Sequence, residues 1–177
     1  MSGLNRFKEA QDDPHAGFES AIAELRAGHK QGHWIWYIFP QLSGLGVSSL
    51  SRLYGINGRV EAREYLEDGL LRSRLLTVTE TVAARLKEGT PVRVLMGSSV
   101  DAQKLVSSLT LFGEVSKELS AAGALGAGSP VEAREGRGAS TPSSEYEFLG
   151  RAAAAVLAVT EQEGFPPCRF TLAALKG

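Results

Sequence analysis

Residues able to bind a ligand or move a proton are concentrated in two stretches of the sequence. One runs from His33 through an aromatic segment to Ser49, and the other covers positions 104–110. The imidazole of His33 has an ordinary pKa of about 6.5, which suits general acid or base catalysis. A histidine at the edge of an aromatic cluster can equally cap a helix or form a buried hydrogen bond. His33 is therefore the candidate catalytic residue, with a structural role as the alternative.

A loop rich in glycine and serine follows the aromatic segment. Gly44 and Gly46 precede Ser48 and Ser49, which can begin a helix, and exposed backbone N–H groups at a helix start attract anions such as phosphate. Gln41 can both donate and accept hydrogen bonds through its amide. A dinucleotide-binding fingerprint would need glycine at position 49 and a preceding βα unit, and neither is indicated. The loop is a candidate anion-binding segment, or simply the start of a helix.

The second stretch places polar side chains on a helix that is otherwise apolar. Lys104 and Ser108 are one helical turn apart, and Ser107 lies beside them. If this face meets the glycine loop, an ammonium group and two hydroxyls converge on one anionic group. If it faces water, it is an ordinary solvated surface. We include these three residues in the candidate binding site.

Two tryptophans stand two positions apart in the aromatic segment. The rings of Trp34 and Trp36 could stack on a planar ligand such as a base. Large aromatic side chains in such a run more often fill the core. We include Trp34 in the candidate binding site with core packing as the alternative.

The histidine spacing does not predict a metal site. His29 and His33 are four residues apart, which would place both on one helix face, but Gly32 interrupts the helix and no glutamate lies between them. No cysteine or carboxylate at ligand spacing completes a set. We predict neither a metal site nor a bound cofactor.

The elements that must hold these residues are predicted to be helices. Apolar residues recur at spacings of three and four in several segments, the clearest being positions 70–86, where Leu71, Leu75, Val78, Val82 and Leu86 form one stripe. The segment 34–39 lacks polar alternation, so its pattern fits a buried helix or a buried strand. The pattern as a whole predicts a mainly α-helical, all-α fold.

Length and composition predict one domain spanning 1–177, because a chain of 177 residues can bury a sizeable core. Positions 121–144 are rich in alanine, glycine and serine, which predicts a flexible surface insertion. With 19 basic and 20 acidic residues, general nucleic-acid binding is not expected. The sequence contains one cysteine and no apolar run near the roughly 20 residues that span a bilayer, so we expect an intracellular, cytoplasmic protein without membrane insertion.

Several segments are similar to a known family, domain of unknown function 1810, whose members are sometimes labelled calpastatin. They cover most of positions 6–112 and are RFKEAQ, AELRAGHKQGHWIWYIFPQLSGLGVSSLSRLYGI, EAREYL, RSRLL and DAQKLVSSLTLF. The resemblance implies a mainly α-helical fold and favours a helix for the aromatic segment. It implies no known activity. The insertion departs from the family, and the tail keeps only TLAAL.

These residues lead to two functional hypotheses. The first is a site for a small anionic or nucleotide-like ligand, made by the loop 41–49 and the helix 104–110. The second is a non-catalytic protein-interaction module that contacts an unidentified protein partner through positions 121–144 or an apolar groove. The residue types do not establish a reaction, so they do not decide whether the protein is an enzyme.

Overall fold

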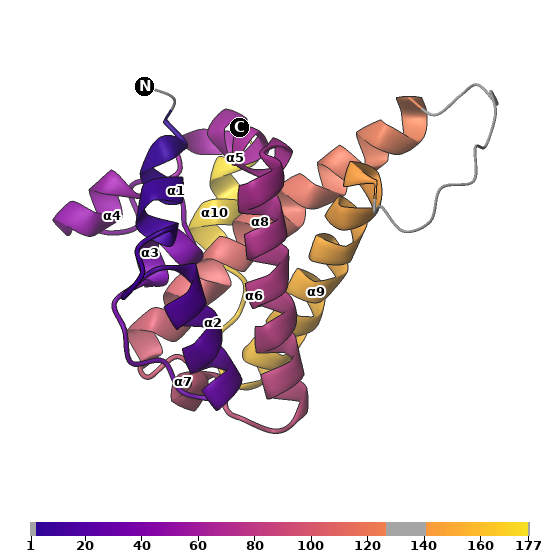
Figure 1. Ribbon diagram of the computed structural model, residues 1–177. Coiled ribbons are helices and arrows are strands. Elements are labelled where there is room, and N and C mark those ends of the chain that lie inside the picture. Colours follow the sequence, from indigo (N-terminus) through magenta and orange to yellow (C-terminus); the bar gives the residue numbers. More distant parts are fainter. Residues whose placement is uncertain (1–2, 127–140, 177) are drawn as a thin grey trace.

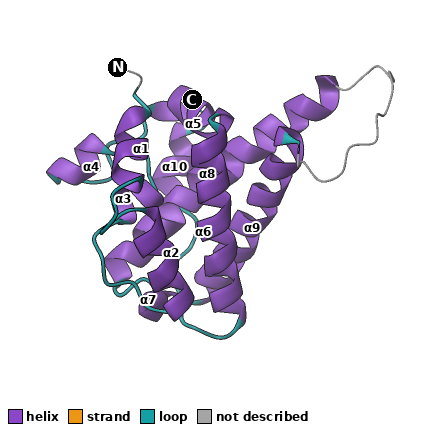
Figure 2. Cartoon of the chain, viewed as in Figure 1, coloured by secondary structure: helices purple, strands orange, loops and turns teal. Residues whose placement is uncertain are grey.

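The computed structural model describes residues 3–126 and 141–176, and within these ranges the chain forms ten helices and no strand (Figure 2). The all-α prediction is confirmed. The helices are α1 (Asn5–Gln11), α2 (Phe18–Ala27), α3 (Ile35–Ile38), α4 (Ser49–Leu53), α5 (Gly58–Glu67), α6 (Gly69–Lys87), α7 (Val92–Leu95), α8 (Ser99–Gly126), α9 (Pro142–Gln162) and α10 (Arg169–Ala174).

Three long helices form the centre of the fold. Helix α8 packs most extensively against α9, and α9 in turn packs against α6. Figure 1 shows α8 crossing behind α6, with α2 against the other side of α6. The predicted stripe Leu71, Leu75, Val78, Val82 and Leu86 is buried along α6. Helical periodicity therefore identified the face that enters the core.

Aromatic side chains fill the core between the N-terminal helices and α8. The rings of Phe7 and Tyr65 meet edge to face with centroids 5.2 Å apart, and Tyr65 lies 4.9 Å from Phe112. Such pairs add to the free energy gained by burying the rings. They join α1 and α5 to the middle of α8.

The aromatic segment forms the short helix α3, so the structure favours a helix over a buried strand. Helix α3 contacts α1 and α8. The loop after α3 then reaches α4, which Figure 1 shows at the edge of the molecule. This path brings positions 41–51 close to the start of α8.

The ends of the predicted insertion 121–144 belong to helices. Helix α8 continues to Gly126, and Thr141 caps α9 by accepting a hydrogen bond from the Ser144 amide. Arg72 of α6 forms an ion pair with Glu145 in the first turn of α9, with an N–O distance of 2.5 Å. The remainder of the predicted insertion lies outside the described residues.

Candidate functional site

A cavity of about 400 Å³ lies where the loop after α3 meets the first turns of α8, and we call it the Lys104 cavity. Its lining comes from three separate segments of the chain. The lining residues are Trp36, Gln41, Leu45, Gly46, Val47, Ser48, Ser51, Val100, Gln103, Lys104 and Ser107. Its size is within the range of pockets that bind small molecules.

Backbone pairing fixes Gln41 at the wall of this cavity. An isolated parallel bridge joins Leu42 to Ile56, with the Ile56 amide donating to the Gln41 carbonyl at 2.9 Å. The Gln41 residue is 9% exposed and lines the cavity. Its side-chain amide is not among the unpaired polar groups that are closed off from solvent in the described residues, so it opens onto the cavity. The donors and the acceptor of Gln41 are therefore available to a ligand.

The loop packs directly on α4 because Gly46 has no side chain. A Cβ atom at Gly46 would lie 2.7 Å from the Cβ atom of Ser51, which is too close for any other residue without a shift. Ser48 caps α4, since its hydroxyl accepts a hydrogen bond from the Ser51 amide at 3.1 Å. Of the two serines that could begin this helix, Ser48 is therefore the cap, and it sets one side of the cavity.

Charge at the cavity comes from two lysines that share one aspartate. Asp101 lies 2.7 Å from the Lys30 ammonium and 3.0 Å from the Lys104 ammonium. Burial would raise the pKa of Asp101, but its hydrogen bonds to Lys30 and Lys104 outweigh burial and lower that pKa. Two ammonium groups beside one carboxylate leave a net positive charge, and Lys104 presents it to the cavity.

Each lysine also lies over a tryptophan ring. The Lys104 nitrogen is 4.3 Å from the centroid of Trp36, and the Lys30 nitrogen is 5.0 Å from the centroid of Trp34. Cations are attracted to the electron-rich face of an indole ring. Trp36 therefore helps to hold Lys104 in place and also offers the cavity a flat aromatic surface.

The matches to known proteins agree with this fold. Residues 1–125 match the family model described as a protein of unknown function, DUF1810. The chain belongs to the DUF1810 family. It is similar to the conserved hypothetical protein Rv1873 from Mycobacterium tuberculosis, whose crystal structure has a TM-score of 0.71 and 33% sequence identity, with 98% of this chain and 96% of that chain covered. No curated protein matches the chain.

Five of the residues that this sequence predicts for a ligand site line the Lys104 cavity. They are Gln41, Gly46, Ser48, Lys104 and Ser107. Gly44 lies outside the lining, in an exposed part of the loop, with a φ of 94°. Ser108 is fully buried, and its hydroxyl has no hydrogen-bond partner among the described residues. The two serines are adjacent in α8, but only Ser107 contributes to the cavity.

Trp34 and His33 also lie outside the cavity lining. Trp34 is fully buried and donates a hydrogen bond from Nε1 to Glu24 at 2.8 Å. That carboxylate also accepts from the amides of Gln31 and Gly32, and these bonds lower the pKa of Glu24 although burial opposes them. His33 is exposed. Trp34 therefore packs in the core of this DUF1810 protein, and His33 does not face the candidate ligand.

Trp36, which could stack on a planar ligand, lines the cavity together with Ser51 and Gln103, which the sequence did not single out. A signal for Trp36 was present. Residues two positions apart on a helix point in nearly opposite directions, so Trp34 and Trp36 could not both enter the core. No comparable signal marks Ser51 or Gln103, because their place depends on how α4 lies against α8.

Within the described ranges, no three His, Cys, Asp or Glu side chains are grouped as they would be to hold a metal ion. The His29 ring lies 2.9 Å from the Val94 carbonyl, so its Nδ1 atom contacts the backbone. None of the helices in residues 3–126 and 141–176 combines the length and the apolar character needed to cross a bilayer.

Proposed function

We propose that this DUF1810 protein binds a small anionic or nucleotide-like ligand in the Lys104 cavity. The observation that carries the proposal is that the Lys104 ammonium and the Gln41 amide line the same cavity. The ammonium can donate hydrogen bonds to a ligand, and the amide can both donate and accept them. An anionic ligand with hydrogen-bonding oxygens would match this pair.

The charge of the cavity favours an anion. The ammonium of Lys104 can leave Asp101 for a ligand while Lys30 keeps the carboxylate paired. The Ser107 hydroxyl lines the same space, whereas the Ser48 hydroxyl donates to the Ser51 hydroxyl and the Ser51 hydroxyl donates to the Ser48 carbonyl. Phosphate oxygens accept hydrogen bonds from both kinds of group.

Trp36 favours a ligand with a flat ring. Its indole lines the cavity next to Lys104, so a ring stacked on Trp36 would place an attached anionic group near the ammonium. Stacking on an aromatic side chain contributes on the order of 1–3 kcal/mol per base in nucleic-acid complexes. This arrangement supports a nucleotide-like ligand over a bare anion.

Binding is tested by calorimetric titration and thermal shift with AMP, ribose 5-phosphate and inorganic phosphate. We expect AMP at millimolar concentration to raise the melting temperature, because a ligand that binds only the folded state stabilises it. Lys104→Met should weaken AMP binding about tenfold, equivalent to about 1.4 kcal/mol. Gln41→Leu should weaken it as well.

Lys117→Met is the matched control. Lys117 is on the same helix and also pairs with an acid three residues earlier, Glu114 at 2.7 Å, but it does not line the Lys104 cavity. We expect this control to leave AMP affinity unchanged. An equal loss in both variants, or no stabilisation by any of the three compounds, would contradict the proposal.

A non-catalytic protein-interaction module is the second candidate function. It is favoured by exposed apolar side chains on and beside α4: Val47 is 86% exposed and Leu53 is 53% exposed. Exposed apolar groups close together often mark a contact surface. Self-association that is lost in Leu53→Ser, together with no response to AMP, would favour this function over ligand binding.

A further inference from the structure

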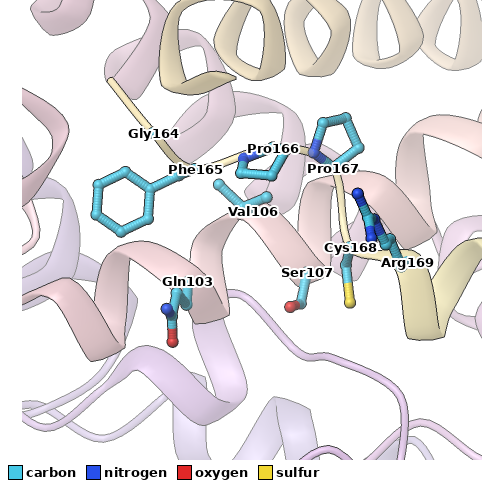
Figure 3. A pocket seen from close by; sticks show the side chains of 9 residues that line it. All are labelled: Gln103, Val106, Ser107, Gly164, Phe165, Pro166, Pro167, Cys168 and Arg169. Carbon is cyan, nitrogen blue, oxygen red and sulfur yellow. The ribbon is translucent and has the colours of Figure 1, made fainter. Parts of the chain in front are cut away.

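A second cavity lies on the other side of Gln103 and Ser107. Its volume is about 330 Å³, and we call it the Phe165 cavity. Helix α8 contributes one wall, and the segment between α9 and α10 contributes the other (Figure 3). The residues of that second wall are Gly164, Phe165, Pro166, Pro167, Cys168 and Arg169.

The two cavities share part of their lining. Gln103 and Ser107 line both the Lys104 cavity and the Phe165 cavity. Ser107 is 8% exposed, so its side chain projects little into the space between the two cavities. Gln103 is exposed, so its side chain can move. A ligand that passes over Ser107 would therefore reach both spaces.

The chemistry of the Phe165 cavity differs from that of its neighbour. Val106, Phe165, Pro166 and Pro167 give it a mostly apolar lining, and the prolines have no backbone N–H to offer. Figure 3 shows the Phe165 ring and the two prolines along one wall, above Val106. Gln103 and Arg169 supply the few polar groups. Such a space suits a ring system with a polar edge.

Hydrogen bonds hold the apolar wall at both ends. The Phe165 amide donates to the Thr160 carbonyl at 2.8 Å, and the Cys168 amide donates to the Thr110 hydroxyl at 3.1 Å. Phe165 also packs against the core. The wall is formed before a ligand arrives, which lowers the entropy cost of binding.

We propose that one ligand occupies both cavities, and that its class is a phosphate monoester of a nucleoside or of a similar ring compound. The phosphate lies beside Lys104 and Gln41, and the linking sugar crosses Ser107. The ring lies in the Phe165 cavity with its polar edge toward Gln103, instead of stacking on Trp36. This inference rests on the proposed function and adds the second cavity to it.

Cys168 gives a direct readout of occupancy. It is the one cysteine in the sequence, it is partly buried, and it lines the Phe165 cavity. Burial would raise the pKa of its thiol, but hydrogen bonds from Ser107 and from the backbone at the start of α10 outweigh burial and lower that pKa. A thiolate reacts faster with alkylating agents than a thiol does. Alkylation of the whole chain therefore reports on this one position.

The experiment measures the rate of alkylation by iodoacetamide, using mass spectrometry, with and without ligand. Saturating AMP should slow alkylation of Cys168 about fivefold or more, because the adenine would cover the thiol. Ribose 5-phosphate, which lacks the adenine base, should bind through the Lys104 cavity and leave the alkylation rate unchanged. AMP should also bind about tenfold more tightly than ribose 5-phosphate.

A charge placed in the Phe165 cavity tests the contribution of the adenine to binding separately from that of the sugar phosphate. Pro166→Glu adds a carboxylate at an exposed wall position, so AMP affinity should fall to that of ribose 5-phosphate, whose own affinity should stay unchanged. Pro14→Glu is the matched control, because Pro14 is an exposed proline that lines neither cavity. It should change neither affinity.

The outcomes distinguish this inference from the proposed function. If AMP binds but does not protect Cys168, the second cavity is not part of the site and the ring stacks on Trp36, so the function proposed for the Lys104 cavity stands. If neither compound binds, both proposals fail. Protection of Cys168 by AMP that survives in Pro166→Glu would also overturn the inference.

Discussion

Two lysine–tryptophan pairs share one aspartate in this protein, yet they lie in different surroundings. Lys30 is 7% exposed and lies over Trp34, which is fully buried. Lys104 lies over Trp36, which lines the Lys104 cavity. The same pair of residue types therefore serves the core in one place and an open cavity in the other.

The two lysine–tryptophan pairs differ in the hydrogen-bond partners that they have within the protein. Trp34 donates to Glu24, and Lys30 donates to the Gly32 carbonyl at 2.5 Å as well as pairing with Asp101. The inner pair has its partners within the fold. Among the residues that the structure describes, Lys104 is paired with Asp101 alone, so its remaining N–H groups are available. Residue types alone do not make a binding site. A binding site also needs hydrogen-bonding groups that have no partner within the protein and that a ligand can reach.

The largest expected effect comes from removing the inner ring. Trp34→Ala should lower the free energy of unfolding by about 3–5 kcal/mol, since it leaves a large cavity in the core and takes a donor from Glu24. Chemical denaturation measures the change. A loss smaller than that of Trp36→Ala would contradict the assignment of Trp34 to the core.

The second largest loss of stability is expected from replacing the aspartate that both lysines share. Asp101→Asn removes the charge that holds both lysines, and we expect a loss of about 1–3 kcal/mol at pH 7. Because the pKa of Asp101 is lowered in the folded state, its stabilising effect is present above the unfolded pKa of about 4 and is lost as pH falls through the folded pKa. The difference between wild type and Asp101→Asn should therefore shrink below about pH 4. Denaturation curves between pH 3 and pH 7, with the wild type as reference, would test this, and a constant difference would argue against the ion pairs.

The outer ring should matter less for stability and more for binding. Trp36→Ala should cost about 1 kcal/mol of stability, because the side chain is only partly buried. AMP affinity should fall severalfold, because the Trp36 ring holds Lys104 at the cavity. Parallel denaturation and titration experiments compare the two effects. A large stability loss with unchanged AMP binding would place Trp36 with the core instead.

The smallest expected stability change belongs to Lys104→Met. Its ion pair with Asp101 is partly exposed, and pairs of that kind contribute about 0–1 kcal/mol. Lys30 would keep Asp101 paired. A calorimetric melting curve checks this expectation, and a loss as large as that of Asp101→Asn would show that Lys104 is structural.

Much of the fold follows from patterns that the chain carries locally. The stripe on α6 and the serine cap of α4 are confirmed because each depends on neighbours within a few residues. The aromatic segment could not be assigned by pattern, and the family resemblance was needed to favour a helix. For the site, the sequence identified the two segments that supply residues to the cavity. It did not show which faces of these segments lie against each other. Ser107 enters the cavity and Ser108 does not, a distinction set by the rotation of α8.

The sequence by itself determined the helical class, the family and the two segments that supply the Lys104 cavity. These depend on periodicity, capping and residue types, all of which act over short distances along the chain. Only the tertiary structure decided that Trp34 is core and Trp36 is not, that Lys30 shares Asp101 with Lys104, and that the segment 164–169 forms a second cavity beside the first. The reason is physical: burial, free hydrogen-bonding groups and shared walls arise only when distant helices pack together.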